Sequence, residues 1–311
     1  MTGRGCTNKL KCMRCLNFAA AAALLPVAVS EAQRVPGRDL LDYPIGTLAE
    51  APALALDSGD GFQNPAALRL AEGTRFRGTA IALNTGTDRG VSAQLIGVAA
   101  NLPSRFTVGF SAVHASISGI GQTIDDPEPI GRDIPYSTFV ASLTGAREST
   151  RHITSAVALR YRTGEVDGVS RSTFGLDGGL LVERLLGFDA RVGVSSFLWG
   201  PGSGEGQDAS FSGAVDSRVV GADSTRQARV GYSYTASEGA AGGHYVFATG
   251  RLSRWIARVG MVRTSAYGTT DTSLRLALVL RYARYTVGLS REESAAGFDP
   301  TYQFVLSGVF R

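Results

Sequence analysis

Short segments in which apolar and polar residues alternate fill the chain from Thr74 to its last residue. In the stretch 272–282 (TSLRLALVLRY), one row of alternate positions reads Leu, Leu, Leu, Leu, Tyr, and the other row includes Arg275 and Arg281. Because successive side chains of a β-strand point to opposite faces, this pattern predicts a strand with one aliphatic face. Clusters of Gly, Asp, Ser, Asn and Pro separate the segments, as is typical of turns.

Fourteen segments follow this pattern, and an even number suits a closed antiparallel sheet. The predicted strands cover residues 74–84, 91–101, 105–118, 135–146, 152–163, 172–184, 188–199, 210–220, 227–236, 243–253, 256–265, 272–282, 285–292 and 301–311. Most have the 9 to 11 residues or more that a tilted strand needs to cross a bilayer. The segment 285–292 is the shortest of them.

The connections between these segments alternate in length. The tight ones are 101–104, 147–150, 185–187, 254–255 and 283–284, with 221–226 as a longer member of the set. The longer ones are 84–90, 120–133, 164–171, 200–208, 236–243, 266–271 and 292–300. Outer-membrane barrels have short periplasmic turns and longer external loops, whereas a soluble β-sandwich, the alternative, has no reason to alternate them. We therefore predict an all-β fold: a transmembrane antiparallel up-and-down β-barrel of 12 to 14 strands over residues 74–311.

Residues 1–32 have the features of a secretory signal peptide. Both lysines and all three cysteines lie within the first 15 residues, and the apolar run 16–29 and the sequence Ser30-Glu31-Ala32 follow. We expect cleavage after Ala32 and export to the outer membrane of a diderm bacterium. The signal peptide holds four of the 31 basic and one of the 27 acidic residues, so the rest of the chain has a net charge near +1.

This composition excludes several classes of protein. Without cysteines after residue 15, the exported chain has neither disulfides nor a thiolate metal site. Its near-zero net charge argues against nucleic acid as a partner. The acidic pairs Asp57/Asp60 and Asp125/Asp126 lack the ligand spacing of a calcium loop. We expect no metal and no cofactor.

Residues 33–73 do not alternate, and they are too few to form a core of their own. They contain the sequence 55–68 (ALDSGDGFQNPAAL), which leads through Asn-Pro-Ala-x-Leu almost directly into the first strand. This stretch resembles the N-terminal region of the long-chain fatty-acid transporter (FadL/PorV-like) family, whose members are fourteen-stranded outer-membrane barrels. In that family the N-terminal segment folds inside the barrel as a plug.

The resemblance implies a plug role for Asn64, Pro65, Ala66 and Leu68, the positions that match the motif. From the residues alone, Pro65 restricts Asn64 to an extended backbone and begins a turn, which a periplasmic linker would also contain. The resemblance also implies passive transport of small apolar or amphipathic molecules, among them carboxylates.

Arginines on the face opposite the aliphatic rows are the candidate ligand-binding residues. Arg229, Arg258, Arg275 and Arg281 lie on nearby strands, and no acidic residue stands on the same faces of those strands. Such a row would attract carboxylates or phosphates and favour anions in a pore. The alternative is that these arginines only brace the interior of the barrel, as we expect for the opposite charges on strands 152–163 and 172–184.

Enzyme activity is not expected. His114 and Ser116 share the apolar face of one strand near an external loop, as in outer-membrane lipid esterases. However, a serine nucleophile needs a base that a third group orients, and the neighbouring strands offer no such group.

Three functions thus remain open: a passive transporter, a non-transporting barrel that anchors partners, and a lipid esterase. The expected partners are outer-membrane lipid, the barrel-assembly machinery and a small hydrophobic or anionic ligand.

Overall fold

The computed structural model describes residues 34–56, 61–70, 73–86, 90–121, 133–185, 189–200, 209–221, 225–237, 240–266, 269–294 and 299–311. The predicted signal peptide, Asp57, Asp60, Asp125 and Asp126 lie outside the described residues. Within these ranges, no helix has the length and hydropathy needed to span a membrane.

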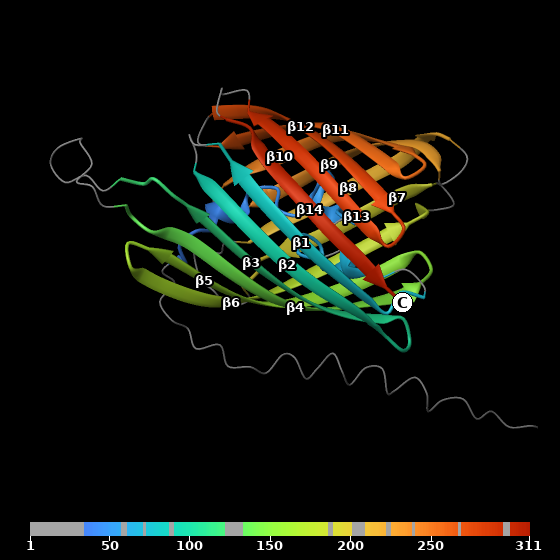
Figure 1. The fold of residues 1–311 in the computed structure, drawn as a ribbon, viewed down its shortest axis with the longest axis horizontal. Helices are drawn as coiled ribbons and strands as arrows, with labels where there is room; N and C mark the ends of the chain where they lie inside the picture. The colour runs from blue at the N-terminus through green and yellow to red at the C-terminus, as the bar shows by residue number, and fades with distance from the viewer. Residues whose placement is uncertain are drawn as a thin grey trace, which may run out of the picture.

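The described strands form one closed antiparallel barrel, in which each strand pairs with its neighbours in the chain and β1 pairs with β14 (Figure 1). The strands are β1 (Phe76–Thr85), β2 (Val91–Leu102), β3 (Phe106–Ile117), β4 (Tyr136–Thr150), β5 (Ile153–Val166), β6 (Val169–Glu183), β7 (Ala190–Phe197), β8 (Ser210–Val220), β9 (Arg226–Ser237), β10 (Ala240–Leu252), β11 (Trp255–Ala266), β12 (Thr269–Tyr282), β13 (Tyr285–Ser294) and β14 (Thr301–Phe310). The prediction of a fourteen-stranded up-and-down β-barrel is confirmed.

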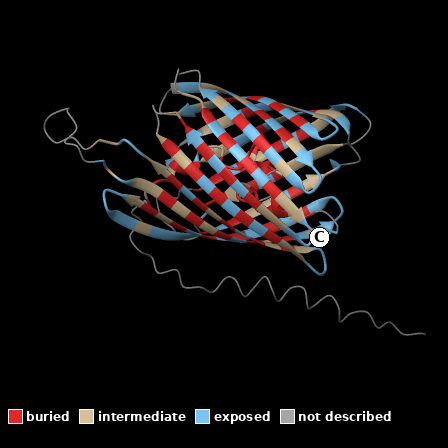
Figure 2. Ribbon diagram, viewed as in Figure 1, coloured by how far each residue is buried: buried red, intermediate tan, exposed pale blue. Residues whose placement is uncertain are grey.

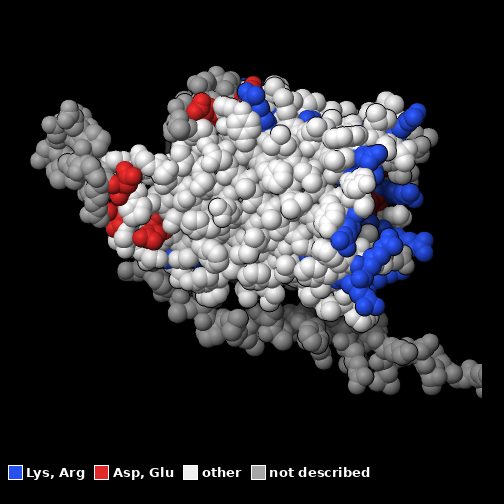
Figure 3. All heavy atoms as spheres, in the orientation of Figure 1, with Lys and Arg blue, Asp and Glu red and all other residues white. Residues whose placement is uncertain are grey.

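The alternation of side chains determines which face of each strand meets lipid. Buried and exposed residues alternate along every strand that faces the viewer in Figure 2, and the exposed rows are rich in Leu, Val, Phe and Tyr. On β12 the predicted aliphatic row is outside, with Leu274, Leu276 and Leu278 about 40 to 50% exposed. On the face that Figure 3 shows, an uncharged belt lies between basic residues at the end near the C-terminus and acidic residues with a few basic ones at the other end. This belt fits the hydrocarbon of a bilayer, where paired strands satisfy their backbone N–H and C=O groups within the sheet.

Three of the predicted external loops are shorter than expected. Strands β5 and β6 extend through the predicted loop 164–171 and meet at a two-residue turn, Asp167–Gly168, with φ values of 48° and 77°. This left-handed pair suits a tight hairpin, because its twist matches that of the strands. Strands also extend into the predicted loops 236–243 and 266–271. Polar residues mark loops in the sequence pattern, but strands that extend beyond the bilayer also carry polar residues.

Residues 34–56 and 61–70 lie inside the barrel, so the lumen is not simply polar. The described part of this N-terminal segment contains three single-turn 3-10 helices, η2 (Asp39–Leu41), η3 (Pro52–Leu54) and η4 (Pro65–Leu68). Its apolar residues and inward-facing strand residues form two buried clusters. One joins Leu48 to Val279 and Val305, and the other joins Leu54 to Leu181.

Glycines on the inward faces of the strands make room for this segment. A Cβ atom at Gly179 would overlap the side-chain oxygen of Asn64, and one at Gly193 would overlap the carbonyl oxygen of Ala53. A Cβ at Gly109 would lie 2.7 Å from a methyl group of Leu68. The barrel wall therefore fits the backbone of the segment closely at several strands.

We predict that Gly179→Ala and Gly193→Ala loosen the N-terminal segment, because the added methyl group cannot be placed without moving the segment's backbone. Overpacking of this kind costs about 1–3 kcal/mol. Trypsin should cleave after Arg38 or Arg69 in the folded variants faster than in the parent barrel. Gly250→Ala is the control, since no atom lies within 4 Å of the added Cβ. Equal cleavage rates in all variants would contradict the close fit.

Candidate functional site

Side chains of the barrel wall bind the backbone of the N-terminal segment at several places. Arg162 of β5 donates to the carbonyl oxygens of Val35 and Pro36 at 2.6 and 2.9 Å. Arg258 of β11 donates to the carbonyl of Leu48 at 3.1 Å. Each bond meets a backbone group that no sheet ladder satisfies, and buried groups of this kind need a partner.

Two more contacts hold the middle of the segment. The hydroxyl of Tyr245 on β10 donates to the carbonyl of Ala49 at 2.7 Å, and the N–H of Gly46 donates to the side-chain oxygen of Gln303 on β14 at 2.5 Å. The anchoring residues thus come from β5, β10, β11 and β14, on different sides of the lumen, so the segment is fixed across it.

Arg160 of β5 is the most deeply buried of the wall arginines. Its guanidinium pairs with Asp177 of β6, both side chains having no exposed surface, and it also donates to the carbonyl of Phe62. The rings of Phe62 and Phe197 lie 4.9 and 4.5 Å from its guanidinium carbon. This confirms the expected charge pairing for Arg160 and Asp177, whereas Glu183, the other acidic residue expected to pair across the two strands, pairs with Arg69 of the N-terminal segment. Arg160 also gives the N-terminal segment an attachment that combines an ion pair, a hydrogen bond and cation–π contacts.

The four motif residues 64, 65, 66 and 68 lie in and next to η4, which packs against β4, β5 and β6. Asn64 caps the helix by accepting from the N–H of Ala66 at 2.9 Å, and its amide donates to the carbonyl of Ala53 at 2.6 Å. Pro65, Ala66 and Leu68 are buried. The motif therefore joins η4 to η3 inside the barrel.

The expectation of an arginine row without acidic partners is wrong. Arg229 pairs with Asp216 and Asp189 at 2.8 Å each, Arg275 with Glu292 at 2.9 Å, and Arg258 with Glu50 at 3.5 Å. Asp216 is on β8, next to the strand of Arg229, and Glu292 is directly opposite Arg275 on β13. Adjacent strands and the N-terminal segment supply the carboxylates, which a search along single strands does not find.

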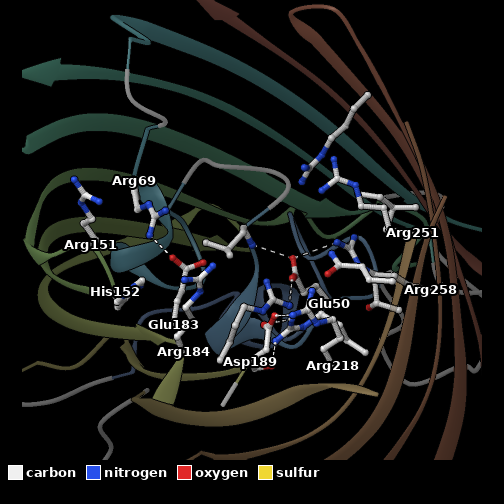
Figure 4. Close-up of a pocket in the computed structure, with 17 residues that line it drawn as sticks. Glu50, Arg69, Arg151, His152, Glu183, Arg184, Asp189, Arg218, Arg251 and Arg258 are labelled. Atoms are coloured by element: carbon white, nitrogen blue, oxygen red, sulfur yellow. Dashed lines mark hydrogen bonds and ion pairs between the residues drawn. The ribbon is translucent and has the colours of Figure 1, made fainter. Parts of the chain in front are cut away.

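The N-terminal segment has a cavity on each side. The larger, of about 780 Å³, is at the end with the tight turns and includes Glu50, Arg229, Arg258 and Arg281 in its lining (Figure 4). The smaller, of about 280 Å³, is lined by Thr47, Pro52, Arg275 and serines and threonines of β8 and β9. The structure therefore brings three of the predicted ligand arginines to one cavity and places Arg275 in the other.

The larger cavity, called the tight-turn cavity below, has a strongly positive lining. Nine arginines and three carboxylates line it: Arg69, Arg151, Arg184, Arg191, Arg218, Arg229, Arg251, Arg258, Arg281, Glu50, Glu183 and Asp189. A hydrogen bond from Arg229 and the charges of nearby arginines hold the pKa of Asp189 below its usual value. This carboxylate therefore stays charged to lower pH than a free aspartate.

Glu50 is the residue that sequence reasoning missed. It is only 2% exposed, and its carboxylate is 3.3 Å from Arg191 and 3.5 Å from Arg258 while also accepting from the N–H of Leu56. Because it lies in the segment without alternation, nothing in the pattern connects it with arginines on β7 and β11.

His114 is exposed on the outer face of β3, as predicted, and the hydroxyl of Ser116 hydrogen-bonds that of Ser92 at 3.2 Å. In the described ranges, no hydrogen bond joins His114 to Ser116. Among the same residues, no group of three or more His, Cys, Asp or Glu could hold a metal ion.

The closed sheet, the apolar belt and the filled lumen define a β-barrel of the outer-membrane type. The sequence matches no protein-family model and no curated protein. The fold is similar to that of a solved structure described as the CymD monoaromatic hydrocarbon channel, with a TM-score of 0.61, 11% identity and coverage of 86% of this chain and 98% of that one. It is also similar to a Pseudomonas aeruginosa FadL homologue, with a TM-score of 0.52, 12% identity and the same coverage. At this identity the likeness concerns the fold, and it agrees with the resemblance noted in the sequence.

We predict that Arg160→Met destabilises the barrel by about 3–5 kcal/mol, because it leaves the buried carboxylate of Asp177 without its partner. The double variant Arg160→Met/Asp177→Asn should recover much of this loss, since the neutral amide needs no counter-charge and still accepts from the N–H of Trp199. Urea unfolding in lipid vesicles measures both. Equal losses in the single and double variants would contradict a charge-pairing role.

Proposed function

We propose that this protein is a passive outer-membrane transporter whose lumen is closed by residues 34–70 acting as a plug. The observation that carries the proposal is the arrangement of the lumen: a segment held to opposite walls, with a cavity on each side of it. A solute that enters one cavity reaches the other only if the segment shifts. The attachments are mostly hydrogen bonds to single carbonyls, which can be exchanged one at a time.

Small amphipathic molecules with an anionic group are the substrates we propose. The inner wall has buried apolar clusters beside the segment and arginines in both cavities, so it offers a surface for each part of such a molecule. The hydrocarbon-channel and FadL-homologue folds are consistent with solutes of this kind. Arg229, Arg258 and Arg281 would meet the anionic group in the tight-turn cavity, and Arg275 in the smaller one.

The alternative is a barrel that does not transport and serves to anchor partners in the outer membrane. The dense packing of the segment favours it, since Leu48 and Leu54 are fully buried. Insertion by the barrel-assembly machinery is proposed under both functions. We propose no enzymatic role, because Ser116 bonds another serine rather than a base.

We predict that deletion of residues 34–70 raises the conductance of the barrel in a planar bilayer severalfold, because the segment fills the lumen between the two cavities. Arg162→Gln/Arg258→Gln keeps the chain complete but removes three bonds to segment carbonyls. This variant should show flickering openings.

The control is Arg263→Gln/Arg291→Gln, which removes two exposed arginines that line neither cavity. Transport itself is tested by uptake of octanoate into proteoliposomes. Transport would be ruled out, and the anchoring role favoured, if neither the parent barrel nor the deletion variant conducts ions or takes up octanoate.

A further inference from the structure

The tight-turn cavity has more positive charge than its carboxylates balance. Beyond the three carboxylates in the lining, Glu148 pairs with Arg69, and Asp216 pairs with Arg191 and Arg229. Among the residues that the structure describes, nine arginines thus face five carboxylates in and around the cavity. In a concave site with low-dielectric walls, such an excess concentrates the field and attracts anions.

Two of the arginines in the lining are exposed at the tight-turn end of the barrel. Arg151, in the turn between β4 and β5, and Arg184, just after β6, are exposed, and in the described part of the chain no ion pair involves either. Figure 4 shows Arg151, His152 and Arg184 on the same side of the cavity, with Glu50 and Arg258 across from them. Guanidinium groups bind carboxylates and phosphates through paired N–H donors, so this wall suits either group.

Glu50 already presents a carboxylate to the deeper arginines of the cavity. It belongs to the plug and contacts Arg191 and Arg258, which belong to the barrel wall. Arg258 also holds the carbonyl of Leu48, two residues away. A second anion at these arginines therefore competes with a contact that keeps the plug in place.

We infer that the tight-turn cavity is a binding site for the carboxylate or phosphate group of a small molecule, which competes there with Glu50 for Arg191 and Arg258. The cavity volume of about 780 Å³ is in the range of small-molecule sites. The inference rests on the proposed function for the route of the ligand and deepens it in two ways. It places anion recognition at the tight-turn end of the lumen, and it makes occupation of that site favour release of the plug.

Calorimetry on the complete barrel in a non-ionic detergent tests this site with two soluble probes, citrate for carboxylates and inorganic pyrophosphate for phosphates. Saturable binding of at least one probe, weakened by added salt, is the expected result. Binding of only one probe identifies which group the site takes. Absence of saturable binding for both at low salt overturns the inference.

Two substitutions assign the binding to this cavity. Arg151→Ser/Arg184→Ser should weaken it about tenfold, and Glu50→Gln should strengthen it about tenfold by removing the competing charge. The matched control Arg263→Ser/Arg291→Ser, with the same loss of charge at the other end of the barrel, should leave the affinity unchanged. If both double variants weaken probe binding equally, the attraction is non-specific and the site is not in this cavity. If the affinity of Glu50→Gln is unchanged, Glu50 does not compete with the probe.

The readout separates this inference from the proposed function. Calorimetry needs no transport, so a barrel that conducts but binds neither probe disproves the anion site alone. A barrel that binds a probe but never conducts disproves transport and leaves the site standing. Faster trypsin cleavage at Arg38 of the plug in the presence of the probe is expected if binding competes with Glu50, and unchanged cleavage speaks against that competition.

Discussion

The structure depends on one constraint: backbone polar groups removed from water must find partners. In the barrel wall, closure of β1 onto β14 meets most of this requirement with ladder bonds, and side chains such as Ser196 bond backbone groups where β6 and β7 do not pair, which allows the outer surface to be apolar. In the lumen, the N-terminal segment has little regular structure, so its carbonyls have no ladder. Arg160, Arg162, Arg258 and Tyr245 supply donors to them instead. Side chains inside the barrel thus supply the segment with the hydrogen-bond donors that a neighbouring strand supplies in a sheet.

This arrangement explains why arginine is the cation that the lumen uses. A guanidinium group can pair with a carboxylate on one edge and donate to a carbonyl on another, as Arg160 does with Asp177 and Phe62. Arg258 likewise contacts both Glu50 and Leu48. In the function we propose, attachment of the plug and recognition of an anionic ligand therefore draw on one set of residues.

The sequence was sufficient to predict the wall, and a resemblance pointed to a segment inside it, but the contacts within the lumen could not be predicted. Alternation on β12 identifies the lipid face, because it follows from the geometry of a single strand. The partners of Arg229, Arg258 and Arg275 could not be found in this way, because they depend on the register between strands and on the path of a segment without periodicity. Glu50 illustrates the second case: it is 208 residues from Arg258 in sequence, and only the folded segment brings them together. Loop lengths were overestimated where polar strand ends, such as those at Asp167, extend beyond the membrane.

Amide hydrogen exchange of the barrel in lipid tests the central claim most directly, because it reports on the segment without any substitution. The amides of Gly46, Glu50 and Leu54 donate to Gln303, Thr47 and Ala51. The account predicts that these amides exchange slowly, at rates similar to those of the strand amides of the barrel wall. If these amides exchange at the rate of an unstructured peptide while those of the strands stay protected, the segment is not held in the lumen. Neither the plug nor the competition between Glu50 and a bound anion would then stand.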